Sequence, residues 1–179
     1  MKTSHLTRVA LMLTLLIISA QFSIPIGPVA ISLQSLVVLI IGLTLPKKQA
    51  VLTTLLYLFA GFIGLPIFSQ AMGGPHSIFL PSFGFILSFI PAVWLMTRIR
   101  KRNSEKGAEN YFQTVFVGNV IIYLIGLSYM TIILMINSDV EITIFKVLSV
   151  GFLPFIPADI LKSLIAIKIS MQLKKYLND

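Results

Sequence analysis

Residues 111–136 read YFQTVFVGNVIIYLIGLSYMTIILMI and contain no Asp, Glu, Lys or Arg. A helix needs about 20 consecutive apolar residues to cross the hydrocarbon core of a bilayer. This stretch is long enough to cross it, and its few polar side chains are uncharged. It therefore predicts a membrane-spanning helix.

The composition of the whole chain agrees with that prediction. Of its 179 residues, 56% are hydrophobic and 11% are charged, and the mean hydropathy is +0.95. A soluble domain carries about 25% charged residues because its surface faces water, so the surplus apolar surface here must face lipid. The apolar runs are continuous, whereas the strands of a membrane barrel alternate apolar and polar residues. We therefore expect an all-α integral membrane protein, a single domain over residues 1–179, with five to seven spans.

Prolines, glycines and charge runs divide the chain into six predicted helices. They are expected at residues 6–22, 33–45, 49–62, 83–99 and 111–136, and from Pro154 or Pro157 to about residue 173. Residues 23–32 are expected to form a loop or broken segment, residues 64–82 a long irregular stretch, and a short helix to end near Val150. The first segment has the pattern of either a signal peptide or a retained helix. No small-x-small cleavage site follows it, so a retained helix is expected.

Basic residues set the orientation, because Lys and Arg are retained on the cytoplasmic side of short loops. With the N-terminus inside, that side collects Lys2, Arg8, Lys47, Lys48, Arg98, Arg100, Lys101, Arg102, Lys106, Lys168, Lys174 and Lys175. The opposite side receives His76, Asp139, Glu141 and Lys146. We therefore expect six spans with both termini cytoplasmic. This placement accounts for the net charge of +8 without nucleic acid, and the basic run at 98–102 is expected to lie near anionic lipid.

Two charged residues fall inside the last predicted span. Asp159 and Lys162 are three residues apart, so they share a helix face. A charge inside a span costs at least ~2.5 kcal/mol, and such residues usually face the protein interior and are functional. We expect them to bind a ligand from the outer side. The alternatives are an ion pair that holds the bundle together, a lysine that reaches the membrane surface, or an aspartate that caps the helix.

Weaker candidates come from polar and glycine-rich positions. They are Asn119 and Tyr123 on one face of residues 111–136, Gln34 and Tyr57 in two other helices, and Gly73, Gly74 and Ser77 in the irregular stretch. Interhelical hydrogen bonds and a flexible outer loop are the ordinary explanations for such residues. No metal site is expected, because the chain has no cysteine and His76 has no second ligand at a suitable spacing. No nucleotide-binding Gly-x-x-x-x-Gly-Lys-Ser/Thr sequence is present either.

Four segments together resemble the BioY family, the biotin-specific S-components of energy-coupling-factor (ECF) transporters. They are residues 23–34 (SIPIGPVAISLQ), 57–68 (YLFAGFIGLPIF), 118–126 (GNVIIYLIG) and 151–162 (GFLPFIPADILK). They occur in the family's order and cover most of the chain. Two positions depart from the family pattern. Phe85 stands where the family usually has a tyrosine, and Ala158 stands where it usually has a glycine.

The resemblance implies a six-helix S-component in the cell membrane that captures biotin from outside. It would work with a transmembrane T-component and two cytosolic ATPase subunits, and would have no cofactor and no enzymatic activity of its own. Ala10 and Thr14 match the small residues that contact the T-component in this family. The expected biotin-binding residues are Asp159, Lys162, Asn119, Tyr123, Gly73, Gly74, Ser77, Gln34 and Tyr57.

Two alternatives to a biotin subunit remain open. An S-component for thiamine or riboflavin would favour an acidic or aromatic-walled site. A small intramembrane enzyme would need a polar catalytic set deeper in the bilayer, and the sequence offers no such set.

Overall fold

The computed structural model describes residues 3–102, 107–137 and 143–177 of the chain. Helices dominate these residues. Their α-helices are α1 (Thr3–Gln21), α2 (Gln34–Thr44), α3 (Lys47–Phe62), α4 (Phe83–Arg102), α5 (Gly107–Asn137), α6 (Ile144–Gly151) and α7 (Ile156–Leu177). The remaining elements are β1 (Ser23–Ile26), β2 (Val29–Ser32) and the 3-10 turns Ser69–Ala71, Pro75–Phe79 and Leu153–Phe155. Asp139 and Glu141, which are expected on the outer side, fall outside the described residues.

The six predicted long helices correspond to α1, α2, α3, α4, α5 and α7, and α6 is the predicted short helix. Within the described residues, four stretches are long and apolar enough to cross a membrane: Thr3–Gln21, Phe83–Arg100, Glu109–Asn137 and Phe145–Leu173. The other two predicted spans are shorter than these stretches, because α2 has 11 residues and α3 has 16. At about 1.5 Å per residue, α2 alone is too short to cross a hydrocarbon core of about 30 Å.

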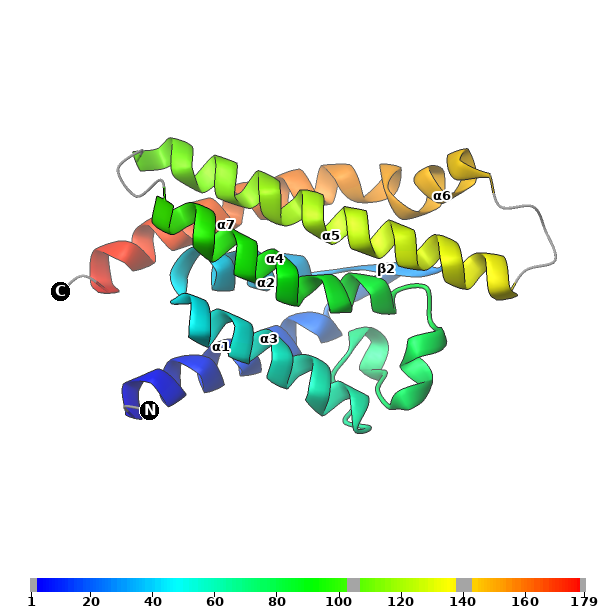
Figure 1. The fold of residues 1–179 in the computed structure, drawn as a ribbon, viewed down its shortest axis with the longest axis horizontal. Coiled ribbons are helices and arrows are strands. Elements are labelled where there is room, and N and C mark those ends of the chain that lie inside the picture. Colours follow the sequence, from blue (N-terminus) through cyan, green and yellow to red (C-terminus); the bar gives the residue numbers. More distant parts are fainter. Residues whose placement is uncertain (1–2, 103–106, 138–142, 178–179) are drawn as a thin grey trace.

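The segment between α1 and α2 is a β-hairpin, where the sequence predicted a loop or broken segment. Its strands pair antiparallel, with Ser23 opposite Ser32 and Ile26 opposite Val29. The two-residue turn is Gly27-Pro28, and Gly27 takes a φ of +67°, which glycine adopts without steric cost. In Figure 1, β2 runs toward the start of α2 along the middle of the molecule. Strand and helix together therefore extend the second crossing.

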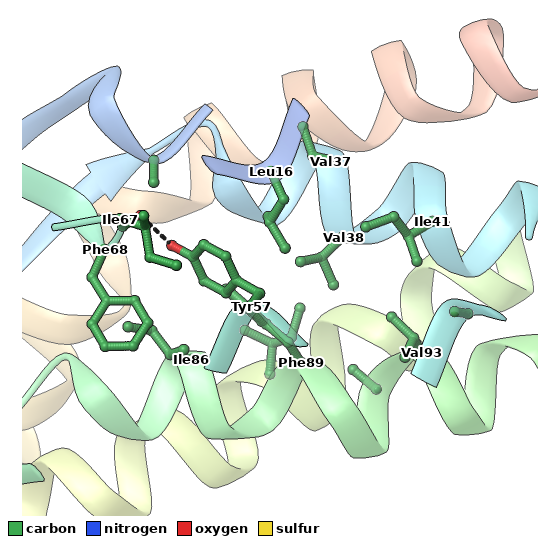
Figure 2. Close-up of a cluster of buried hydrophobic side chains, with 14 of the residues drawn as sticks. Leu16, Val37, Val38, Ile41, Tyr57, Ile67, Phe68, Ile86, Phe89 and Val93 are labelled. Atoms are coloured by element: carbon green, nitrogen blue, oxygen red, sulfur yellow. Dashed lines mark hydrogen bonds between the residues drawn. The ribbon is translucent and has the colours of Figure 1, made fainter. Parts of the chain in front are cut away.

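Buried apolar side chains hold α1 to α4 together (Figure 2). Leu16 of α1, Val38 and Ile41 of α2, and Val93 of α4 lie in one cluster, and Tyr57 of α3 lies among them with no exposed surface. A second cluster joins α2, α4, α5 and α7, and a third joins β2, α5 and α6. Within a bilayer, such side chains hold helices together through close van der Waals packing, because lipid tails are as apolar as the side chains themselves.

The basic ends of the helices lie together. The start of α1, the end of α7, the end of α4 and the turn between α2 and α3 all lie at one end of the bundle (Figure 1). At that end Trp94 of α4 carries two cations on its ring. The Lys47 ammonium is 4.5 Å from the ring centroid and the Arg98 guanidinium carbon is 5.5 Å from it. Arg100 donates to the backbone carbonyl oxygens of Leu43 and Leu45, and so satisfies acceptors left open where α2 ends.

Candidate functional site

A cavity of about 270 Å³ lies between the hairpin, the start of α2, the irregular stretch before α4, and the facing sides of α4, α5 and α7. Its walls are mostly apolar, with a few converging polar groups, which is the usual character of a small-molecule site. The polar side chains lining it are Ser32, Gln34, Ser35, Ser69, Gln70, Ser77, Ser82, Tyr123, Asp159 and Lys162.

Asp159 and Lys162 form an ion pair in this cavity. Lys162 Nζ lies 2.8 Å from Asp159 Oδ1, and it also donates to Ser35 Oγ of α2 at 3.1 Å. The Tyr123 hydroxyl of α5 donates to the other carboxylate oxygen, Asp159 Oδ2. The lysine and aspartate side chains are 8% and 16% exposed, respectively. Two charges removed from water to this degree are tolerated because each is paired and hydrogen-bonded.

The start of α7 explains why this pair faces the cavity. The 3-10 turn Leu153–Phe155 precedes the helix and contains Pro154. Pro157 lies in the first helical turn, where the N–H group that proline lacks would have no intrahelical acceptor. Asp159 follows in the first turn, where the positive end of the helix dipole favours a carboxylate. Lys162, one turn further, lies on the same face. The predicted location of both residues on one face of the last helix is confirmed.

Aromatic rings form one wall of the cavity. Tyr123 packs edge-on against Phe85 of α4, with 6.4 Å between ring centroids, and against Phe152, with 4.8 Å between centroids. Phe85 itself fits against Gly126 of α5, where a Cβ would collide with its ring. Tyr123 is therefore held from both sides, and its hydroxyl is aimed at Asp159.

Ser77 carries a hydroxyl that has no hydrogen-bond partner in the described structure. It lies in the 3-10 turn Pro75–Phe79, is 1% exposed and lines the cavity. A buried polar atom without a partner costs about 1–3 kcal/mol, so such groups are rare in folded proteins. A polar ligand atom in the cavity would satisfy it.

Gln34 and Tyr57 form a second polar group at the edge of the cavity. Gln34 lines the cavity, whereas Tyr57 lies behind it and has no surface there. The Gln34 amide nitrogen donates to the Tyr57 hydroxyl, which in turn donates to the carbonyl oxygen of Ile67 at 2.9 Å. Of these two predicted ligand-binding residues, Gln34 therefore lines the cavity and Tyr57 does not.

Three other predicted residues lie away from the cavity lining. Asn119 faces a separate groove between α5 and α7, where it donates to Ser163 Oγ at 2.9 Å. Gly74 donates its backbone N–H to the Gly61 carbonyl at 2.7 Å, and Gly73 packs so close to the Leu65 carbonyl that no side chain would fit. The two glycines shape the irregular stretch. Their predicted contact with ligand stays a prediction.

Sequence reasoning missed several cavity residues. The hairpin contributes Pro25 and Ala30, α2 contributes Ser35, and the irregular stretch contributes Ser69 and Gln70. The hairpin had a usable signal, because a two-residue Gly-Pro step separates two short runs rich in isoleucine and valine. The other residues had none, because their place depends on how distant segments pack. In the described part of the chain, no three His, Asp or Glu side chains lie close enough to hold a metal ion.

The fold defines a helical membrane protein, and the cavity between its helices is a candidate site for a small molecule. The BioY family model matches residues 1–179, so the chain belongs to the BioY family. A probable biotin transporter BioY from Pyrococcus horikoshii is 33% identical over 174 residues, covering 97% of this chain and 98% of that protein. The biotin transporter BioY of Thermotoga maritima is 30% identical over 171 residues, covering 96% of each.

A solved structure has the same fold. It is the S-component for biotin from an ECF-type ABC transporter, determined at 2.1 Å. Its TM-score with this chain is 0.79 at 28% identity, over 97% of this chain and 92% of that chain. The predicted fold class, a helical membrane protein of the S-component type, is confirmed.

Proposed function

We propose that this chain is the biotin-binding S-component of an ECF-type vitamin transporter and acts as a transport subunit without catalytic activity of its own. One observation carries the proposal most directly. The Asp159–Lys162 pair lies in a mostly apolar cavity beside an unpartnered serine hydroxyl.

Biotin has the chemistry that this cavity would complement. Its neutral ureido ring offers N–H donors and a carbonyl acceptor, and its tail ends in a carboxylate. The Asp159 carboxylate accepts from the ureido N–H groups, and the Lys162 ammonium donates to an oxygen of the ligand. The Ser77 hydroxyl supplies a further polar contact, and the wall formed by Phe85 and Tyr123 packs against the fused rings. Asn119, Gly73 and Gly74 support the site from outside the cavity lining.

The same cavity disfavours the alternative vitamins. Thiamine is cationic, and among the described residues the one carboxylate lining the cavity is already neutralised by Lys162. Riboflavin carries a flat three-ring system, and a cavity of about 270 Å³ is slightly smaller than the usual ligand pocket of about 300–1,000 Å³. An intramembrane enzyme is disfavoured because the relatives of this chain in the BioY family are described as biotin transporters.

Uptake would require partners that supply ATP hydrolysis, and α1 offers a surface for them. Ala10 and Thr14 are both exposed, and the Thr14 hydroxyl donates to the Ala10 carbonyl at 2.9 Å, so it leaves no polar group unpaired. Small residues at this spacing allow a second helix to approach closely in a membrane. We infer that a T-component docks on this face of α1, that two ATPase subunits bind that component in the cytosol, and that both termini of this chain are cytoplasmic.

Equilibrium binding of labelled biotin to the purified protein in lipid nanodiscs tests the function. We expect saturable binding of one biotin per chain, with thiamine and riboflavin failing to compete at a hundredfold excess. Displacement of biotin by either vitamin, or an absence of biotin binding by folded protein, would contradict the proposal.

A further inference from the structure

Gln34 is hydrogen-bonded to three different segments of the chain. Its amide oxygen accepts from Ser32 Oγ at the end of β2, at 2.9 Å, and from Ser69 Oγ, at 2.8 Å. Its amide nitrogen donates to the Tyr57 hydroxyl of α3. An amide oxygen has two lone pairs, so both of its acceptor positions are occupied by the protein itself.

Tyr57 continues this chain of hydrogen bonds into the same segment that Ser69 belongs to. Its hydroxyl donates to the Ile67 carbonyl, the contact drawn as a dashed line in Figure 2. Its ring packs edge-on against Phe68, with 5.5 Å between centroids. Gln34 thus reaches residues 67–69 by two routes, directly through Ser69 and indirectly through Tyr57.

The segment held in this way is part of the cavity wall. Phe68, Ser69, Gln70 and Met72 all line the cavity. The segment also turns sharply, because Gln70 and Ala71 have φ values of 62° and 55°, which are uncommon for residues other than glycine. Backbone in this region persists only where the surrounding contacts hold it in place. The bonds from Gln34 and Tyr57 reach this segment from α2 and α3. From α1, the Gln21 amide adds longer bonds to the Ile67 and Phe68 carbonyl oxygens, at 3.5 and 3.4 Å.

We propose that Gln34 is a positioning residue that keeps residues 67–72 closed over the cavity, and that its effect on ligand binding acts through this segment. The inference rests on the proposed function for the identity of the ligand. The position of the segment in the free protein is independent of that identity. Without Gln34, the Ser69 hydroxyl loses its acceptor and Tyr57 loses its donor, so the strained turn opens more often.

Opening of the wall has a distinct kinetic signature. A ligand under a closed segment leaves only when the segment opens, so its dissociation rate follows the opening equilibrium. We expect Gln34→Ala to raise the biotin dissociation rate on the order of fivefold to tenfold, as the loss of one or two hydrogen bonds implies. The association rate should rise by a similar factor, because the ligand enters and leaves through the same opening, so the affinity should change little. Ser69→Ala and Tyr57→Phe each remove one of the two routes and should produce a smaller increase.

Hydrogen exchange on the ligand-free protein tests the positioning role by itself. The reporting amides are those of Ile67, Phe68 and Met72, which donate to the backbone carbonyl oxygens of Leu65, Met72 and Ser69. In Gln34→Ala their exchange should accelerate by the same factor as dissociation, while amides in the middle of α5 keep their protection and so show that the bundle is folded. Tyr111→Phe and Ser149→Ala are matched controls outside the cavity lining, and should change neither rate.

The two measurements separate the possible failures. Unchanged exchange at residues 67–72 in folded Gln34→Ala would overturn the positioning role, even if affinity fell, because Gln34 would then act by touching the ligand. Faster exchange in that variant, combined with an absence of biotin binding by the wild-type protein, would support the positioning role and contradict the proposed function instead.

Discussion

Lys162 Nζ lies 2.8 Å from Asp159 Oδ1, and the two side chains belong to successive turns of α7 that face one cavity. Replacing either residue therefore also changes the environment of the other. If one is removed, the remaining charge is left buried without its partner, so a loss of binding and a loss of folding must be measured together.

Asp159→Asn and Lys162→Ala should each weaken biotin binding by about 2–5 kcal/mol, because each leaves a buried charge unpaired. Isothermal titration and thermal unfolding of the same samples check this. Lys146→Ala removes an exposed lysine of α6 and is the matched control, with no expected change. Normal affinity in either folded cavity variant would remove that residue from the site. A parallel loss of stability and binding would mean that the pair only holds α7 in place.

Ser77→Ala should weaken biotin binding by about 1 kcal/mol and leave the stability of the free protein unchanged or slightly raised. The reason is that the hydroxyl has no partner to lose in the ligand-free structure. Titration of Ser77→Ala beside Ser149→Ala, whose hydroxyl donates to a backbone carbonyl away from the cavity, isolates the effect. Equal affinities for both variants would show that the Ser77 hydroxyl does not meet the ligand.

Ala10→Leu and Thr14→Leu should weaken assembly with an ECF module at least tenfold and spare biotin binding, since a larger side chain on this face separates the docked helices. Co-purification with the module and biotin titration of the isolated chain give the two readouts. Leu15→Trp changes an exposed position on a different face of α1 and serves as control. Assembly that survives both leucine substitutions would exclude this face as the docking surface.

The orientation can be tested by cysteine labelling, because the natural chain contains no cysteine. Lys146→Cys should react with a membrane-impermeant maleimide added to intact cells, whereas Lys48→Cys should react only after the membrane is opened. Both positions are exposed in the structure. The reverse labelling pattern would place the termini outside the cell.

The sequence predicted the helices well because lipid imposes a strong and local requirement. Every residue of a span such as 111–136 must be compatible with hydrocarbon, so composition alone marks α5, and Pro and Gly mark its neighbours' ends. The pairing of Asp159 with Lys162 was predictable for the same local reason, since residues three apart share a helix face.

The remainder of the site depended on contacts between distant segments. The bond between Gln34 and Ser69 joins residues 35 positions apart, and no periodicity in either segment indicates it. Asn119 and Tyr123 share a helix face, yet Asn119 is turned to Ser163 and does not line the cavity that Tyr123 does. Which of two such residues lines the cavity depends on the rotation of α5 relative to α7. The sequence of one helix does not predict that rotation.

Trp94, the single tryptophan of the chain, determines what the protein's own fluorescence can report. Its indole is covered by Lys47 and Arg98 at the basic end of the bundle, and it is absent from the cavity lining. Emission excited at the indole band is therefore insensitive to events at the vitamin site and sensitive to whatever displaces those two cations. A partner or anionic lipid that reaches this basic end would change the spectrum of an unlabelled protein, and occupation of the cavity alone would leave the spectrum as it was.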